Sequence, residues 1–252
     1  MKLLVRPPSP AFQDALSEHP LRAQIDPERA ARQHAAFVRA LRDAALDVVE
    51  LACEPPLADA CFVSDTLVPL GRCVVLTRPG AESRRPEIES VARFASARIE
   101  EPGTLDGGDV IVYGDRVAIG VSARTNREGA EQLCRLAQDA GLRAFMCPVD
   151  DRLHLASAVT VLGPGRLVGT KAGFRSLDAA GAAEGLERLL IDDEELPAAN
   201  VLATGGRCFM AAGYPRAAAL LRAAGEEIVE LELDEFTKAD GGPTCLVAVL
   251  PL

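Results

Sequence analysis

The stretch Lys238-Ala-Asp-Gly-Gly-Pro-Thr-Cys245 lies near the C-terminus and leads into the apolar run Leu246-Val-Ala-Val-Leu250. Two glycines followed by a proline predict a sharp, rigid bend. The apolar run predicts a strand that starts at Cys245 and is covered on both faces. Together they would bring one thiol to the mouth of a strand, where a nucleophile could act. Taken alone, a cysteine in this position is more typical of a small residue buried in a core.

Upstream of this stretch, the chain repeats one order of elements: a strand pair, a helix, a further strand and a polar loop. About five such units follow one another without a low-complexity linker. One helix is expected to open at Asp26-Pro27, and another is expected over residues 179–189. Strands that alternate with helices predict an α/β fold. We expect one domain over residues 1–252, with the chemistry gathered in polar loops at one end.

Composition excludes several classes of partner. Of the 252 residues, 48% are hydrophobic and 25% are charged, and the net charge is −10. Such a charge argues against nucleic acid and anionic membranes as partners. No run reaches the roughly 20 apolar residues of a membrane span, and the N-terminus lacks the apolar segment of a signal peptide. Seven scattered cysteines without CxxC pairs indicate neither a disulfide framework nor a zinc site. We therefore predict a cytoplasmic protein without a bound metal.

Among the three histidines, His154 is the best partner for Cys245. His19 sits in a proline-rich loop, and His34 falls on the apolar face of a predicted helix, as a core histidine would. His154 precedes a predicted strand, as Cys245 does. A cysteine and a histidine that meet in space supply a thiolate nucleophile and a proton shuttle.

Charged residues in the loops suggest the substrate. Each one taken singly is most simply a solvated surface group. Carboxylates can nevertheless grip the planar fork of a guanidinium, and arginines can bind a carboxylate. The acids concerned are Asp59, Asp65, Asp106 and Asp109, and the arginines are Arg84, Arg85 and Arg124. The set outlines a site for an amino acid that carries a guanidinium.

Five motifs together resemble the dimethylarginine dimethylaminohydrolase family, which belongs to the guanidino-group-modifying (pentein) superfamily. They occur in the family's order along the whole chain, and as a set they are specific. The resemblance implies a five-bladed, pseudo-symmetric α/β propeller of ββαβ units. The motifs are Thr77-Arg-Pro-Gly-Ala-Glu-Ser-Arg-Arg85, Leu105-Asp-Gly-Gly-Asp-Val110, Ser122-Ala-Arg-Thr-Asn126, Leu153-His-Leu155 and Asp240-Gly-Gly-Pro-Thr-Cys245.

The resemblance also implies roles. Cys245 would be the nucleophile, His154 the acid and base, and Asp106 a catalytic carboxylate that grips the guanidinium together with Asp65. The expected contacts to the rest of the substrate come from Asp59 and the backbone oxygen of Leu16 (α-ammonium), Arg84 and Arg124 (carboxylate), and the backbone of Ala239.

One position departs from the family. Ser64 stands where the family has glutamate, so a hydroxyl replaces a carboxylate beside the expected pocket, which bears on the N-alkyl group that the site prefers.

The function expected from the resemblance is hydrolysis of Nω-methylated arginines to citrulline and an alkylamine, through a covalent thiouronium on cysteine. It needs no cofactor, and its partner is a small guanidino amino acid. Family members are often dimers, so a homodimer is favoured. Two alternatives stay open: a sister guanidine hydrolase acting on arginine or another guanidino compound, and a non-catalytic protein that binds a guanidino ligand. Carboxylates near Cys245 should raise the pKa of its thiol.

Overall fold

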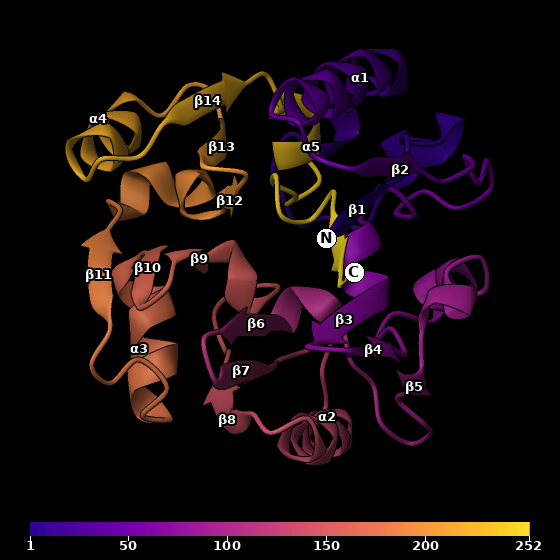
Figure 1. Ribbon diagram of the computed structural model, residues 1–252. Helices are drawn as coiled ribbons and strands as arrows, with labels where there is room; N and C mark the ends of the chain where they lie inside the picture. Colours follow the sequence, from indigo (N-terminus) through magenta and orange to yellow (C-terminus); the bar gives the residue numbers. More distant parts are fainter. Residues whose placement is uncertain (252) are drawn as a thin grey trace.

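The computed structural model describes residues 1–251, and its strands form five separate three-stranded sheets arranged around a common axis (Figure 1). In each sheet the innermost strand is antiparallel to the middle strand, and the middle strand is parallel to the outer one. From inside outward, the sheets are β15 (Ala248–Leu250), β1 (Lys2–Val5) and β2 (Val48–Glu50); β3 (Leu67–Leu70), β4 (Cys73–Leu76) and β5 (Ala97–Arg98); β6 (Val110–Tyr113), β7 (Arg116–Val121) and β8 (Arg143–Pro148); β9 (Val159–Gly163), β10 (Arg166–Gly169) and β11 (Glu187–Leu190); and β12 (Leu202–Thr204), β13 (Arg207–Ala211) and β14 (Ile228–Leu231).

The ring is closed by its own ends. The last strand, β15, pairs with the first, β1, with Lys2 opposite Leu250, so the termini lie close together near the axis (Figure 1). The first sheet therefore takes strands from both ends of the chain. The five-bladed α/β propeller expected from the sequence is confirmed.

Helices provide the crossover from the middle to the outer strand in four blades. They are α1 (Pro27–Asp43), α2 (Arg127–Asp139), α3 (Lys171–Ala179) and α4 (Pro215–Ala223). The β4–β5 crossover instead uses short 3-10 helices over Glu82–Ile88 and Ala92–Phe94, and a short helix α5 (Asp234–Thr237) precedes the cysteine stretch. As expected, α1 begins at Pro27 and is capped by the side chain of Asp26.

Two expected elements are corrected by the structure. The helix expected over residues 179–189 does not form: α3 ends at Ala179, and Gly181 and Gly185 then adopt φ of 69° and 74°, which L side chains disfavour and which end a helix. The expected strand at Cys245 begins only at Ala248. Cys245 itself lies in a turn, because its N–H donates to the carbonyl oxygen of Gly242 at 3.0 Å.

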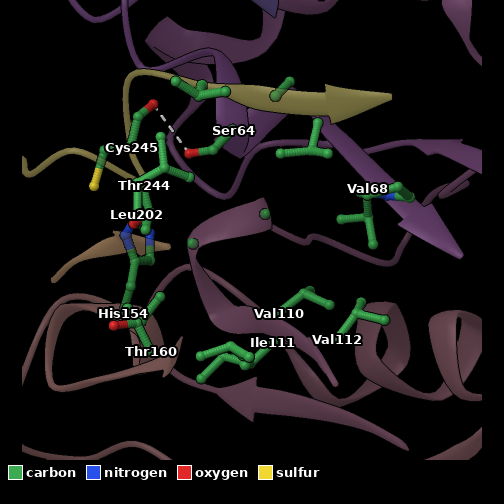
Figure 2. Close-up of a pocket in the computed structure, with 18 of the residues that line it drawn as sticks. Ser64, Val68, Val110, Ile111, Val112, His154, Thr160, Leu202, Thr244 and Cys245 are labelled. Carbon is green, nitrogen blue, oxygen red and sulfur yellow. Dashed lines mark hydrogen bonds between the residues drawn. The ribbon is translucent and has the colours of Figure 1, made fainter. Parts of the chain in front are cut away.

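A cavity of about 390 Å³ runs along the axis of the ring. Its wall takes residues from the innermost strand of every blade, among them Val68, Val112, Val161, Ala203 and Val249. Figure 2 shows the valines of β3 and β6 at one end and His154, Thr244 and Cys245 at the other. The five apolar cores lie between the blades rather than on the axis. Within residues 1–251, no helix is both long and apolar enough to cross a membrane.

Candidate active site

A second, narrower pocket opens where the loops of several blades meet. It brings together eight of the residues that the sequence singled out, although they come from segments up to 229 positions apart in a chain of 252. These residues are Leu16, Asp59, Asp65, Arg84, Arg124, His154, Ala239 and Cys245. We call this space the acidic pocket. Ser64 does not line it and instead lines the axial cavity, where its hydroxyl donates to the carbonyl oxygen of Cys245 at 3.1 Å.

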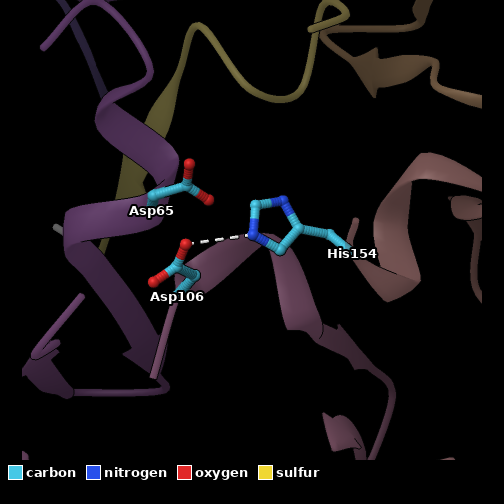
Figure 3. A group of neighbouring side chains, drawn as sticks. All are labelled: Asp65, Asp106 and His154. Atoms are coloured by element: carbon cyan, nitrogen blue, oxygen red, sulfur yellow. Dashed lines mark hydrogen bonds and ion pairs between the residues drawn. The ribbon is translucent and has the colours of Figure 1, made fainter. Parts of the chain in front are cut away.

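His154 and Asp106 form a buried pair at the base of the acidic pocket, with Asp65 beside them (Figure 3). His154 Nε2 lies 3.0 Å from Asp106 Oδ2, and the three residues are at most 6% exposed. Burial by itself acts to lower the pKa of His154, but Asp65, the hydrogen bond to Asp106 and Asp109 outweigh it and raise that pKa to about 9. Burial acts to raise the pKa of Asp106, whereas His154 and Arg84 hold it below its usual range. The pair is therefore an imidazolium and a carboxylate at neutral pH.

The glycines of the Asp-Gly-Gly-Asp motif allow these groups to approach. The N–H of Gly108 donates to Asp65 Oδ1 at 2.8 Å. A Cβ at Gly108 would lie 2.6 Å from His154 Nδ1, and a Cβ at Gly107 would lie 1.9 Å from the carbonyl oxygen of Ser64. Both contacts are too short for a methyl group, so the motif needs glycine for close packing of its backbone.

Asp109, the second acid of the motif, does not reach the acidic pocket. It is fully buried and accepts hydrogen bonds from Ser122 Oγ at 2.6 Å, Thr125 Oγ1 at 2.7 Å and the N–H of Leu155 at 3.0 Å. It therefore ties the loop that carries Arg124 to the segment that carries His154, and its role is to position them.

The thiol of Cys245 is held by a residue that sequence reasoning missed. Asn200 Nδ2 donates toward Cys245 Sγ at 3.5 Å, and Asn200 Oδ1 accepts from the N–H of Thr244 at 2.9 Å. The segment at Asn200 gave no signal in the sequence, because a single asparagine before a strand is common in loops. Burial first, and then Asp65, raise the pKa of the thiol to about 11. The expected direction is thus observed, with burial as the larger cause.

Arg84 is placed differently from the free carboxylate clamp that the resemblance implied. Its Nη1 donates to Asp65 Oδ2 at 2.7 Å, and its Nε and Nη2 both donate to Glu87, Nη2 at 2.9 Å. Arg84 is 4% exposed. Most of its five donors are therefore used inside the protein. Glu87 was not singled out in the sequence. It lies three positions after Arg84, and this spacing brings two side chains together within one helical turn.

The far end of the acidic pocket carries opposite charges. The N–H of Leu16 donates to Asp59 Oδ1 at 3.1 Å, which fixes the carboxylate of Asp59 against the N-terminal loop. Burial raises the pKa of Asp59, and Arg84 opposes that rise. Arg124 Nη1 is buried and has no hydrogen-bond partner among the described residues. A buried cationic donor without a partner is costly, so this atom is suited to meet an anionic group of a ligand.

Asp65, Asp106 and His154 are also the one described cluster whose spacing could suit a metal ion, since one ligand atom from each lies within 4.8 Å of the others. The pair that His154 Nε2 forms with Asp106, and the pair that Arg84 forms with Asp65, already use these atoms. A protonated imidazole cannot ligate a metal. The arrangement therefore favours proton transfer over metal binding.

Three comparisons show which known proteins this chain is similar to. A family model described as arginine deiminase matches residues 54–146. The N(G),N(G)-dimethylarginine dimethylaminohydrolase of Streptomyces coelicolor is 38% identical over 97% of this chain and 95% of its own length. A solved structure of the Pseudomonas aeruginosa enzyme, a variant complexed with citrulline, has a TM-score of 0.90 at 33% identity and covers 98% of this chain and 97% of its own. A dimethylarginine dimethylaminohydrolase adduct with S-methyl-L-thiocitrulline gives the same TM-score and identity, over 98% of each chain.

Proposed function

The chain belongs to the dimethylarginine dimethylaminohydrolase family, and we propose that it hydrolyses Nω-methylated arginines to citrulline and an alkylamine. One observation carries the proposal: a single pocket holds the thiol of Cys245, the imidazole of His154 paired with Asp106, and a donor of Arg124 that has no hydrogen-bond partner within residues 1–251. A thiol and an imidazolium at the base of a pocket with carboxylates suit covalent attack on a cation.

In the bound substrate, Asp65 and Asp106 hold the guanidinium, and Arg124 binds the α-carboxylate through Nη1. Asp59 and the backbone oxygen of Leu16 receive the α-ammonium, and Ala239 borders the chain beside the cysteine. Arg84 contributes mainly by fixing Asp65, because most of its own donors are engaged by Asp65 and Glu87. The two arginines therefore do not bind the substrate carboxylate equally, because Arg84 is buried among acids that already use its donors.

The first half-reaction forms a carbon–sulfur bond and breaks a carbon–nitrogen bond. The Cys245 thiol first loses its proton to solvent, because His154 is already protonated. The thiolate then attacks the guanidinium carbon and gives a tetrahedral adduct. Asp106 engages Nε2 of His154, so the imidazolium gives up its proton from Nδ1 to the departing nitrogen. A neutral amine leaves, and a cationic S-alkylthiouronium remains on Cys245.

The second half-reaction uses the same imidazole in the opposite sense. His154, now neutral, takes a proton from water as the water adds to the thiouronium carbon. Collapse of this adduct breaks the carbon–sulfur bond, and its hydroxyl proton passes to the departing sulfur, so citrulline and the neutral thiol of Cys245 are released. The carboxylate of Asp106 stabilises the imidazolium each time it forms, as the buried pair at 3.0 Å allows.

Binding of the substrate also activates the nucleophile. With a pKa of about 11, Cys245 is a neutral thiol in the free protein at neutral pH. The substrate brings a guanidinium cation beside it, which favours the thiolate and offsets the effect of Asp65. Well below pH 9 the imidazolium predominates, so kcat/KM should rise there about tenfold per pH unit as the thiolate fraction grows.

The proposal is tested by incubating the protein with asymmetric dimethylarginine, monomethylarginine, arginine and agmatine separately, and assaying for the ureido product. We expect citrulline from the two methylated arginines, and loss of product in Cys245→Ser. The control is Cys53→Ser, since Cys53 is exposed and does not line the acidic pocket. Product from arginine alone would instead assign the chain a deiminase activity, which the arginine deiminase family match makes the second candidate. Binding without turnover would indicate a guanidino-binding protein.

The proposal also covers the cellular location and the oligomeric state of the protein. We propose a cytoplasmic location, supported by seven cysteines that are all free in the described chain, and a homodimeric state, supported by the family resemblance. Size-exclusion chromatography with light scattering measures the second, and a monomer at all concentrations would contradict it.

A further inference from the structure

The axial cavity and the acidic pocket share two wall residues, and these are the two that react. His154 and Cys245 line both spaces. In Figure 2 they stand at one end of the axial cavity, with Val68 and Val112 at the other end. The reacting centre therefore lies between a narrow charged pocket and a wide cavity behind it.

The mouth of the axial cavity is suited to an apolar group. Besides His154, its lining among the described residues contains no charged side chain. The hydroxyl of Ser64 is engaged by the carbonyl oxygen of Cys245, and Gly107 and Gly108 present no side chain at all. The volume of the axial cavity is about 390 Å³. A methyl group is about as large as a water molecule, which occupies about 30 Å³, so one or two methyl groups would leave most of the cavity empty.

The chemistry of the leaving group points to the same space. The nitrogen that departs must face His154, because His154 gives it a proton. On the acidic side of His154 lie Asp65 and Arg84, which are buried and paired with each other. An alkyl group pressed against them would displace hydrogen bonds that it cannot replace. On the other side of His154 lies the axial cavity.

We propose that the axial cavity is the subsite for the N-alkyl group of the substrate and the route by which the amine leaves. This rests on the proposed function. The covalent intermediate on Cys245 fills the acidic pocket with the rest of the amino acid, so the neutral amine departs on the opposite side. The subsite takes straight alkyl chains longer than methyl, because the cavity continues past the mouth between the innermost strands.

The experiment compares kcat/KM for Nω-methyl-, Nω-propyl- and Nω-butylarginine in the parent and in Ala156→Leu. Ala156 lines the cavity two positions after His154 and is half-buried. We expect the parent to process the butyl compound within about tenfold of the methyl compound. The variant should keep the methyl activity within a few fold and lose at least about tenfold on butyl, the size of effect that a few methylenes have in a filled pocket.

Two further variants make the result decisive. Ala203→Leu narrows the cavity from another blade and should give the same dependence on chain length if Ala156→Leu does not fold. Ala219→Leu makes the same change on the exposed side of α4 and should leave all three substrates unaffected. Rejection of butylarginine by the parent, or an equal loss on all substrates in both cavity variants, overturns the subsite. Absence of citrulline from methylarginine in the parent overturns the proposed function instead, so the two failures are distinct.

Discussion

The pair formed by His154 and Asp106 gives the sharpest prediction, through the substitution Asp106→Asn. The amide has the shape of the carboxylate and can keep the hydrogen bond that Asp106 Oδ1 accepts from the N–H of Gly80 at 2.9 Å. The NH₂ group of the asparagine would replace Oδ2 and would face Nε2 of His154 as a donor. An imidazolium, which also needs an acceptor there, is then disfavoured.

The magnitude follows from the shift in the parent. The pKa of His154 is raised from its ordinary 6.5 to about 9, which corresponds to about 3 kcal/mol in favour of the charged form. Asp65 and Asp109 share in that effect, so removal of one charge in direct contact should lower the pKa by about 1–3 units. His154 would then be at least half neutral at pH 8, and kcat there should fall, by up to about 10²–10⁴-fold where the general acid is lost almost completely.

The assay is a pH titration followed by histidine side-chain NMR, which is tractable because the chain has only three histidines. The control is Asp43→Asn, at the exposed end of α1, which should leave the titration unchanged. A pKa of His154 near 6.5 in the parent would refute the reasoning. So would a value that stays near 9 in Asp106→Asn, since the direct pair would then not be its cause.

The raised pKa of His154 should also make the free energy of unfolding depend on pH. Because the pKa of His154 is raised on folding, its contribution is fully present below pH 6.5 and is lost as the pH rises through about 9. Urea unfolding of the parent at pH 6 and pH 9 should show this loss, and in Asp106→Asn it should be smaller.

Three further predictions concern neighbouring residues. Asn200→Ala removes the donor 3.5 Å from Cys245 Sγ, so iodoacetamide capture should report a higher thiol pKa and kcat should fall about tenfold; an unchanged profile would contradict the role of Asn200. Gly108→Ala places a methyl group 2.6 Å from His154 Nδ1 and should lower kcat by about 10²-fold, whereas full activity would mean that the loop shifts freely. Burial lowers the pKa of His34 to about 4, so the parent should lose up to about 3 kcal/mol of stability as the pH falls from 6.5 to 4, and urea unfolding of His34→Leu should not show this loss.

Much of the fold was predictable because it depends on local pattern. Alternating apolar runs gave the strands, and Asp26-Pro27 gave the start of α1. The errors were also local. The helix expected over residues 179–189 does not form, because Gly181 and Gly185 adopt positive φ angles that end α3. The apolar run after Cys245 predicts a strand that starts at this residue. Cys245 instead lies in a turn, which is closed by the hydrogen bond from its N–H to the carbonyl oxygen of Gly242.

The kinds of residue in the site followed from the sequence by itself, since a thiol, an imidazole, acids and arginines are chemical properties of single positions. Their arrangement did not. Closure of the ring brings Leu16, His154 and Cys245 to one pocket, and no local pattern encodes their distance. Only the tertiary structure decides that Asp106 contacts His154, that Asp109 does not reach the pocket, and that Arg84 is paired with buried acids. Burial sets the pKa values, and burial is a property of the whole ring rather than of any segment.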